Sequence, residues 1–166
     1  ASNVPKADIF GASDPLAIIY VGSATEPIAK TKTIPVTLNP VWNENFLLNF
    51  AVALDRDTTN SADFPVVRIE VYDMATLGLG DFLGQVEIGP EVYFGQKKKG
   101  DFKLTPSPYF DNKKNKLAID GENKMLNSKI TLTWSVIDKD SAIENRYYVH
   151  NAFGNLSYIS YINAKI

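Results

Sequence analysis

The sequence contains no cysteine and a single histidine, His150, among its 166 residues. Without cysteine the chain has no disulfide framework, no thiolate zinc site and no cysteine nucleophile, and it suits a cytosolic address without establishing one. Long hydrophobic runs are also missing, because no stretch of about 18 apolar residues occurs. We therefore expect any membrane contact to be peripheral.

A large charge of one sign is absent as well. The chain has 17 Lys and Arg against 19 Asp and Glu, a net charge of -2. Because nucleic-acid-binding domains are usually strongly basic, we expect no nucleic-acid partner. The chain opens at Ala1 with no charged and apolar leader, so we expect it to be a piece of a longer protein.

Short runs of β-branched and aromatic residues, bounded by Gly, Pro, Asn and Asp, recur along the chain. Helical periodicity is scarce, so the pattern predicts an all-β fold, and a sandwich in particular. In residues 130–137 apolar residues alternate with Thr and Ser, as in a strand with one buried face. The predicted strands are Leu16–Val21, Ile28–Thr33, Asn45–Phe50, Val66–Tyr72, Leu83–Ile88, Phe102–Leu104, Ile130–Ile137 and Leu156–Ile162.

Two acidic loops carry the most informative residues. Residues 6–15, KADIFGASDP, and residues 71–84, VYDMATLGLGDFLG, each contain two aspartates and glycine. Clustered carboxylates repel one another unless a cation neutralises them. Calcium favours oxygen ligands in flexible loops, whereas zinc prefers histidine or cysteine. The loops therefore predict a calcium site, although a single aspartate in a loop more often caps a turn.

The motifs VPKADIFGASDP, KTKT, LNPVWNENF, VYD and DFLG resemble, in order and spacing, those of the C2 domain family. The resemblance is dense over residues 4–88 and looser through GDFKL and KITLTWSV. It implies an eight-stranded antiparallel β-sandwich of Greek-key connectivity. In that family the loops at one end bind calcium, and the loop tips then engage anionic phospholipid.

The resemblance assigns metal-ligand roles to four aspartates and two backbone carbonyls: Asp8, Asp14, Asp73 and Asp81, with Ile9 and Met74. Ala75 stands where the family has a further aspartate that commonly helps to bridge two ions. Loss of that carboxylate should weaken calcium binding and leave fewer ions bound.

Four apolar residues at the tips of the two acidic loops are predicted to insert into the membrane: Ile9, Phe10, Leu77 and Leu79. Burial of roughly 100 to 150 Å² per loop, at about 25 cal/mol per Å², would contribute several kcal/mol. The alternative is that the loops fold back and bury these side chains, or that single exposed apolar residues have no role.

A second group lies where some members of the family hold phosphoinositide on a sheet face: Lys30, Lys32, Trp42 and Asn43. For Trp42, packing as a core aromatic is an equal alternative. The lysine runs at 97–103 and 112–116 are expected to lie in loops, as solvated surface rather than as a lipid-headgroup site.

The family's strand before the first calcium loop is missing from this sequence, and a sandwich without it would expose an unpaired edge. We expect one domain over residues 1–166, with a core at 1–137, a linker at 138–153 and a further strand at 154–166. That segment can dock in its own chain, exchange with a second chain in a dimer, or open another repeat.

Catalysis is not expected, because the sequence has no phosphate-binding glycine loop, no GxSxG motif and no paired nucleophile and base. The expected function is calcium-dependent binding to anionic phospholipid, at the cytoplasmic surface of membranes, on behalf of a larger protein. The alternative is a calcium-independent module with a degenerate metal site that binds a protein partner or a phosphoinositide. Ala75 favours the alternative, whereas the apolar loop tips and the other four aspartates oppose it.

Overall fold

The computed structural model describes residues 1–7, 12–51, 65–75, 78–93, 96–107, 127–137 and 159–166. Within these ranges the chain forms eight strands and one short helix. The prediction of an all-β, antiparallel fold is confirmed. The elements are β1 Pro15–Val21, β2 Ala29–Lys30, β3 Asn45–Ala51, β4 Val67–Ala75, β5 Gly78–Ile88, α1 Pro90–Tyr93, β6 Lys99–Lys103, β7 Lys129–Ile137 and β8 Ile159–Lys165.

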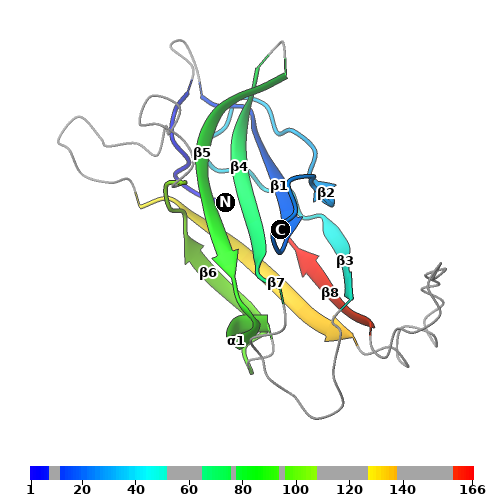
Figure 1. The fold of residues 1–166 in the computed structure, drawn as a ribbon. Helices are drawn as coiled ribbons and strands as arrows, with labels where there is room; N and C mark the ends of the chain where they lie inside the picture. Colours follow the sequence, from blue (N-terminus) through cyan, green and yellow to red (C-terminus); the bar gives the residue numbers. More distant parts are fainter. Residues whose placement is uncertain (8–11, 52–64, 76–77, 94–95, 108–126, 138–158) are drawn as a thin grey trace.

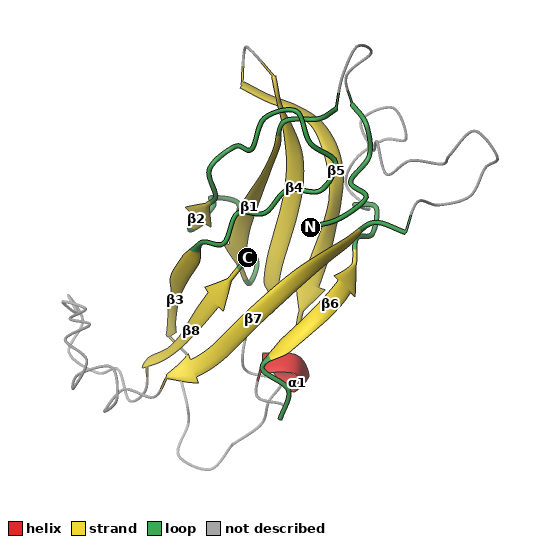
Figure 2. Cartoon of the chain, turned by 180° about the vertical axis from the view of Figure 1, so that it is seen from behind, coloured by secondary structure: helices red, strands yellow, loops and turns green. Residues whose placement is uncertain are grey.

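The described strands form two sheets, of order β2-β1-β4-β5 and β3-β8-β7-β6. Every pairing between neighbouring strands is antiparallel. Figure 1 shows the two sheets as separate layers, and Figure 2 shows the β3-β8-β7-β6 sheet from the opposite side. Helix α1 follows β5 and lies at the end of the molecule remote from the C-terminal end of β4 (Figure 1).

One hydrophobic core lies between the sheets. It joins Ile19 and Ile69 from the first sheet to Leu132 and Trp134 from the second. Strand β7 supplies its buried side chains at alternate positions, because the side chains of a strand point to opposite faces in turn. The predicted alternation is confirmed at 130–135, where the intervening Thr and Ser side chains are exposed.

The C-terminal strand β8 lies in the middle of its sheet, between β3 and β7. It pairs with β3 from Ala51↔Ile159 to Asn45↔Lys165, and with β7 from Ile137↔Tyr161 to Thr133↔Lys165. Its backbone therefore joins two strands of its own chain that would otherwise lie apart. In this structure the terminal segment is docked in the same chain.

Several predicted strand limits were wrong. The segment expected at Ile28–Thr33 is reduced to Ala29–Lys30, because the Thr31 side chain and the Lys32 N–H bond outside the ladder. Thr31 Oγ1 accepts the N–H of Ala17, and the N–H of Lys32 donates to Oε1 of Glu44. The Thr31 hydroxyl therefore replaces a backbone carbonyl as the acceptor of the Ala17 N–H, while the Thr31 N–H still donates to the carbonyl of Ala17 at 2.9 Å.

The second acidic segment and the lysine run also differ from expectation. Strands β4 and β5 extend to Ala75 and Gly78, so most of residues 73–82 is paired strand rather than loop. Residues 99–101, in the lysine run that was expected to lie in a loop, belong to β6, which pairs with β7. The predicted strands at 102–104 and 156–162 begin and end a few residues away from β6 and β8.

Part of the outer face of the β2-β1-β4-β5 sheet is also buried. Leu16, Ile18, Tyr72 and Phe82 form a second apolar cluster there, with the Tyr72 and Phe82 rings edge to face at 5.4 Å. Strand β1 is therefore buried on both faces, which explains its nearly continuous apolar sequence.

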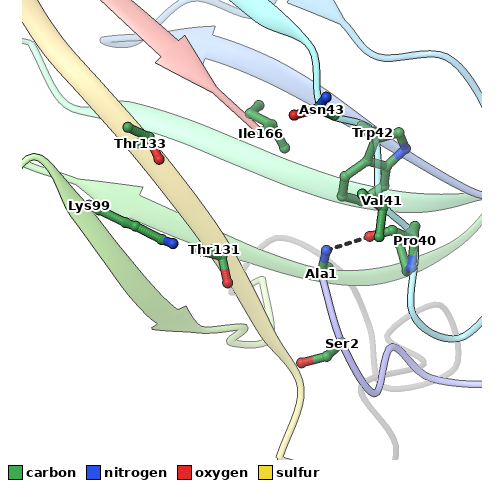
Figure 3. A pocket seen from close by; sticks show the side chains of 10 residues that line it. All are labelled: Ala1, Ser2, Pro40, Val41, Trp42, Asn43, Lys99, Thr131, Thr133 and Ile166. Atoms are coloured by element: carbon green, nitrogen blue, oxygen red, sulfur yellow. Dashed lines mark hydrogen bonds between the residues drawn. The ribbon is translucent and has the colours of Figure 1, made fainter.

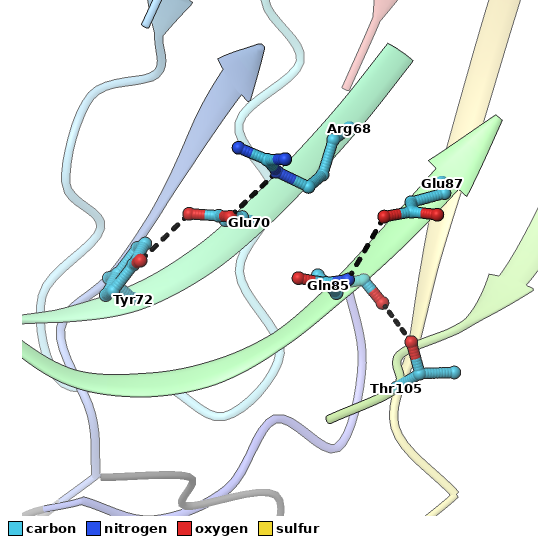
Figure 4. Close-up of polar contacts among 6 residues, drawn as sticks. All are labelled: Arg68, Glu70, Tyr72, Gln85, Glu87 and Thr105. Carbon is cyan, nitrogen blue, oxygen red and sulfur yellow. Dashed lines mark hydrogen bonds and ion pairs between the residues drawn. The ribbon is translucent and has the colours of Figure 1, made fainter. Parts of the chain in front are cut away.

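A polar row continues this face along β4 (Figure 4). Glu70 accepts a hydrogen bond from the Tyr72 hydroxyl at 2.8 Å and lies 2.9 Å from Nε of Arg68. The Arg68 guanidinium also stacks over the Tyr20 ring, 4.7 Å from its centroid. The buried carboxylate of Glu70 is thereby held between a cation and a hydroxyl donor, as burial of a charge requires.

Candidate metal centre at one end of the sheet

The antiparallel register of β1 and β4 brings two predicted metal ligands together. Pro15 pairs with Asp73, so Asp14 lies next to Asp73 at the start of β1. The N–H of Asp14 donates to Oδ1 of Asp73 at 2.6 Å, and the N–H of Met74 donates to the carbonyl of Asp14 at 3.0 Å. Residues from two distant parts of the sequence therefore share one site.

A β-bulge places the third aspartate at the same end. Tyr72 pairs with Phe82 and Met74 pairs with Leu79, which leaves Gly80 and Asp81 opposite Asp73. An extra residue in one strand bends it and redirects its side chains. At Gly80 a Cβ atom would lie 3.1 Å from the carbonyl oxygen of Asp73, so the close approach of the strands depends on glycine.

The base of the first acidic loop is held by Ser13. Its hydroxyl is buried, donates to the carbonyl of Pro5 at 2.7 Å and accepts the N–H of Ala7 at 2.9 Å. Ser13 thus ties the two chain segments that flank the loop to each other and positions Asp14 beside them.

The carboxylates differ in exposure. Asp73 is 5% exposed, while Asp14 and Asp81 are half-buried. Each of the two paired carboxylates accepts a backbone hydrogen bond. Oδ1 of Asp73 accepts the N–H of Asp14, and Oδ1 of Asp14 accepts the N–H of Val36 at 2.7 Å. Such charge-assisted bonds hold the two carboxylates in position.

The donor chemistry of these residues fits calcium, because all three side chains offer hard carboxylate oxygens. Among the described residues, no group of three or more Asp, Glu, His or Cys side chains is close enough together to form a metal site. Asp8, the fourth predicted carboxylate, and Ile9 lie outside the described residues. The structure therefore brings part of the predicted ligand set to one end of the sheet.

The predicted membrane-inserting residues are only partly placed. Ile9, Phe10 and Leu77 lie outside the described residues. Leu79 lies on β5 opposite Met74, close to the β4–β5 turn. Met74 itself is half-buried and packs against the second apolar cluster, so its backbone rather than its side chain lies beside the aspartates.

The proposed headgroup residues do not share one environment. Lys30 and Lys32 are exposed, whereas Trp42 is 7% exposed, belongs to the core and donates from Nε1 to the carbonyl of Pro15 at 3.3 Å. The packing alternative therefore accounts for the position of Trp42. Asn43 and one edge of Trp42 line a cavity of about 440 Å³ next to Ile166 and Thr131 (Figure 3). A headgroup role for this group stays a prediction.

Sequence reasoning did not single out Val36 or Ser13, although both contact the site. The Ser13 contacts join residues on either side of one loop, and the contact between Val36 and Asp14 joins residues 22 positions apart. The SDP motif is the only local signal for either contact.

The chain is similar to known proteins of one family. A model of the family described as C2 domain matches residues 1–105. The human protein RasGAP-activating-like protein 1 is 34% identical over 108 residues, which cover 65% of this chain and 12% of that protein. Synaptotagmin-4 of Arabidopsis thaliana is 32% identical over 88 residues, which cover 53% of this chain and 14% of that protein.

A solved structure is also similar. A C2 domain of plant Extended Synaptotagmin 1 has 16% sequence identity and a TM-score of 0.49, over 99% of this chain and 85% of that one. The matched segments span only about an eighth of each of the two curated relatives. Among the described residues, no helix has the length and apolarity needed to cross a bilayer.

Proposed function

Because the chain belongs to the C2 domain family, we propose that it binds anionic phospholipid membranes in a calcium-dependent manner and is not an enzyme. Membrane or lipid binding is the general activity of this family. The calcium dependence, the preference for anionic lipid and a peripheral location at the cytoplasmic surface of membranes are the parts that we propose here. We also propose that the complete fold is the family's eight-stranded Greek-key sandwich.

One observation carries this proposal: the sheet register brings Asp14, Asp73 and the bulged Asp81 to the same end of the β2-β1-β4-β5 sheet. Like charges at one end of a sheet are unfavourable without a cation. The three residues also match the family's ligand positions one by one. Asp8 and the carbonyls of Ile9 and Met74 would complete the set.

In the proposed mechanism the acidic surface would gain positive charge from bound calcium. Asp73 and Asp14 would hold the ion, and their backbone hydrogen bonds keep the two carboxylates in place before the ion arrives. In the absence of the ion, the same carboxylates would repel an anionic leaflet. Apolar residues near the loop tips, Leu77 and Leu79 among them, would then enter the acyl boundary.

A calcium-independent interaction module is the second candidate. Ala75 favours it, because this exposed residue at the end of β4 replaces a carboxylate of the family pattern. The ligand could then be a protein partner, or a phosphoinositide bound near Lys30 and Lys32. The three aspartates at one end of the sheet oppose this candidate, because a module without a metal site would not require carboxylates at these family ligand positions.

Co-sedimentation with vesicles tests the proposal. The chain is mixed with phosphatidylserine-containing vesicles in excess calcium or in chelator, beside the variants Asp14→Asn and Asp73→Asn. Asp101→Asn is the matched control, because Asp101 lies on β6 and pairs with Lys129 at 2.7 Å, away from the proposed centre.

We expect the chain and the Asp101→Asn variant to sediment in calcium and to stay in solution in chelator. The Asp14→Asn and Asp73→Asn variants should stay in solution in both buffers. Equal sedimentation in calcium and chelator would favour the calcium-independent candidate, and absence of sedimentation in both would contradict membrane binding.

A further inference from the structure

Val36 combines three unusual properties. Its side chain is 71% exposed, its backbone is in the left-handed region with φ of 54°, and its N–H donates to Oδ1 of Asp14 at 2.7 Å. It follows Pro35 in the connection between β2 and β3. Each property bears on what the side chain does.

A valine is a poor choice for this backbone position. A left-handed conformation is an outlier for a β-branched residue, and a turn with positive φ after proline ordinarily has glycine. The other described residues with positive φ are glycines and two asparagines, Asn3 and Asn43, which tolerate it. Among the described residues with positive φ, only Val36 is β-branched.

Burial does not offset this conformational cost, because most of the Val36 side chain faces solvent. Strained residues persist where the surrounding structure holds them, and they cluster at functional sites. Here three hydrogen bonds hold the connection to the start of β1: Ile34 N–H to Pro15, Val36 N–H to Asp14 and Thr37 N–H to Ser13. Val36 is thus fixed beside the aspartates of the proposed metal centre.

We propose that Val36 is a further membrane-contacting residue, which enters the acyl boundary of an anionic bilayer beside the two acidic loops. The inference rests on the proposed function and adds a third chain segment to its membrane contact. The Asp14 carboxylate has a second role in it, since it holds the Val36 backbone in the conformation that presents the side chain.

A bilayer suits this residue better than a protein partner does. An apolar side chain that stands alone beside carboxylates would meet a charged surface in a protein complex. On a membrane, the carboxylates would hold calcium at the level of the lipid headgroups, and an apolar tip would pass beyond them into the acyl region. The connection between β2 and β3 passes the same end of β1 that carries Asp14 (Figure 2).

Val41 provides a matched control. It is the same residue type in the same connection, it is 77% exposed, and it lines the cavity formed with Ala1 and Trp42 rather than contacting an aspartate. The variants Val36→Ala, Val41→Ala and Val36→Gly are compared with the unsubstituted chain. The readouts are partition into phosphatidylserine-containing vesicles in calcium and the thermal midpoint of unfolding in chelator.

We expect Val36→Ala to weaken partition by up to about fifteenfold, the effect of removing the equivalent of two buried methylene groups. Val41→Ala should leave partition unchanged. Val36→Gly should weaken partition at least as much as Val36→Ala, while its thermal midpoint stays equal to or above that of the unsubstituted chain, because glycine relieves the strain. This combination separates lipid contact from a structural role.

Two outcomes would overturn the inference. If the chain sediments in calcium but all three valine variants sediment equally well, Val36 does not contact lipid and the proposed function stands. If the unsubstituted chain does not bind the vesicles at all, the proposed function and the inference are both wrong.

Discussion

The backbone N–H of Asp14 donates to Oδ1 of Asp73, with 2.6 Å between the two atoms. This bond joins the end of the first acidic segment to the hairpin formed by β4 and β5. The two carboxylates are therefore organised by the sheet itself, through the pairing of Pro15 with Asp73. Calcium affinity should depend on this arrangement and on the packing that supports it.

Gly80 is expected to control the position of Asp81. In a Gly80→Ala variant the new methyl group would lie 3.1 Å from the Asp73 carbonyl and 3.3 Å from Cβ of Ala75, so the two strands would be pushed apart by a few tenths of an ångström. Calcium affinity should fall about tenfold, with a loss of about 1 to 3 kcal/mol in the free energy of unfolding. Calorimetric calcium titration and urea unfolding measure the two quantities, and unchanged calcium affinity would contradict the role of the bulge.

Restoring the missing carboxylate should strengthen calcium binding. Ala75 is exposed and pairs with Gly78, so an aspartate fits at this position without displacing the core. An added charge a few Å from the ion should raise calcium affinity by about tenfold or more in Ala75→Asp. Ala75→Asn, of equal size but neutral, is the control. Equal affinities for the two variants would show that charge at this position is irrelevant.

Tyr72 should make the fold sensitive to alkaline pH. Burial, followed by the hydrogen bond to Glu70, raises the pKa of the Tyr72 hydroxyl above its ordinary value of 10.0. Above that pH the unfolded chain loses a proton that the folded chain keeps, so stability should fall as pH rises. The free energy of unfolding, measured at a series of pH values on either side of 10.0, reports this fall.

Tyr72→Phe checks the same contact in two ways. Loss of the hydroxyl leaves one buried oxygen of Glu70 without its donor, which should cost about 1 to 3 kcal/mol at neutral pH. The decline in stability above pH 10.0 should also become shallower than in the unsubstituted chain. An identical alkaline decline in the variant would assign the effect to other groups.

The terminal strand should be essential to the isolated chain. Ile162 pairs with Leu48 on one side and Val136 on the other, so Ile162→Pro removes a backbone donor inside the sheet and should cost about 3 kcal/mol or more. Thermal unfolding measures this loss. The docking of β8 in its own chain further predicts a monomer by light scattering, and a dimer would indicate strand exchange instead.

The aspartates could be predicted from the sequence because their spacing follows a motif. Asp14 and Asp73 were assigned from the SDP and VYD segments, and the register of β1 and β4 brings them together. The strand content was also predictable, because alternation along 130–137 is a local property. Prediction was weaker at Thr31, just beyond the end of β2, where the side-chain hydroxyl rather than a backbone carbonyl accepts the N–H of Ala17.

The extent of β4 and β5 and the role of Val36 were not predictable from local pattern. The glycines at 78, 80 and 84 are typical of a loop, yet the hairpin uses Gly80 for close approach of two strands. The contact between Val36 and Asp14 depends on the path of the connection between β2 and β3 across the end of β1. No sequence pattern encodes that path, because it follows from how the sheets pack.

The most direct test of the central claim is calcium titration by isothermal calorimetry, with and without phosphatidylserine-containing vesicles. If calcium and the anionic bilayer bind together at the aspartate end, each must raise the affinity for the other by the same factor. We predict that vesicles increase the calcium affinity at least about tenfold, and that Asp73→Asn abolishes the calcium heat in both conditions. A calcium affinity that is the same with and without vesicles would contradict the account.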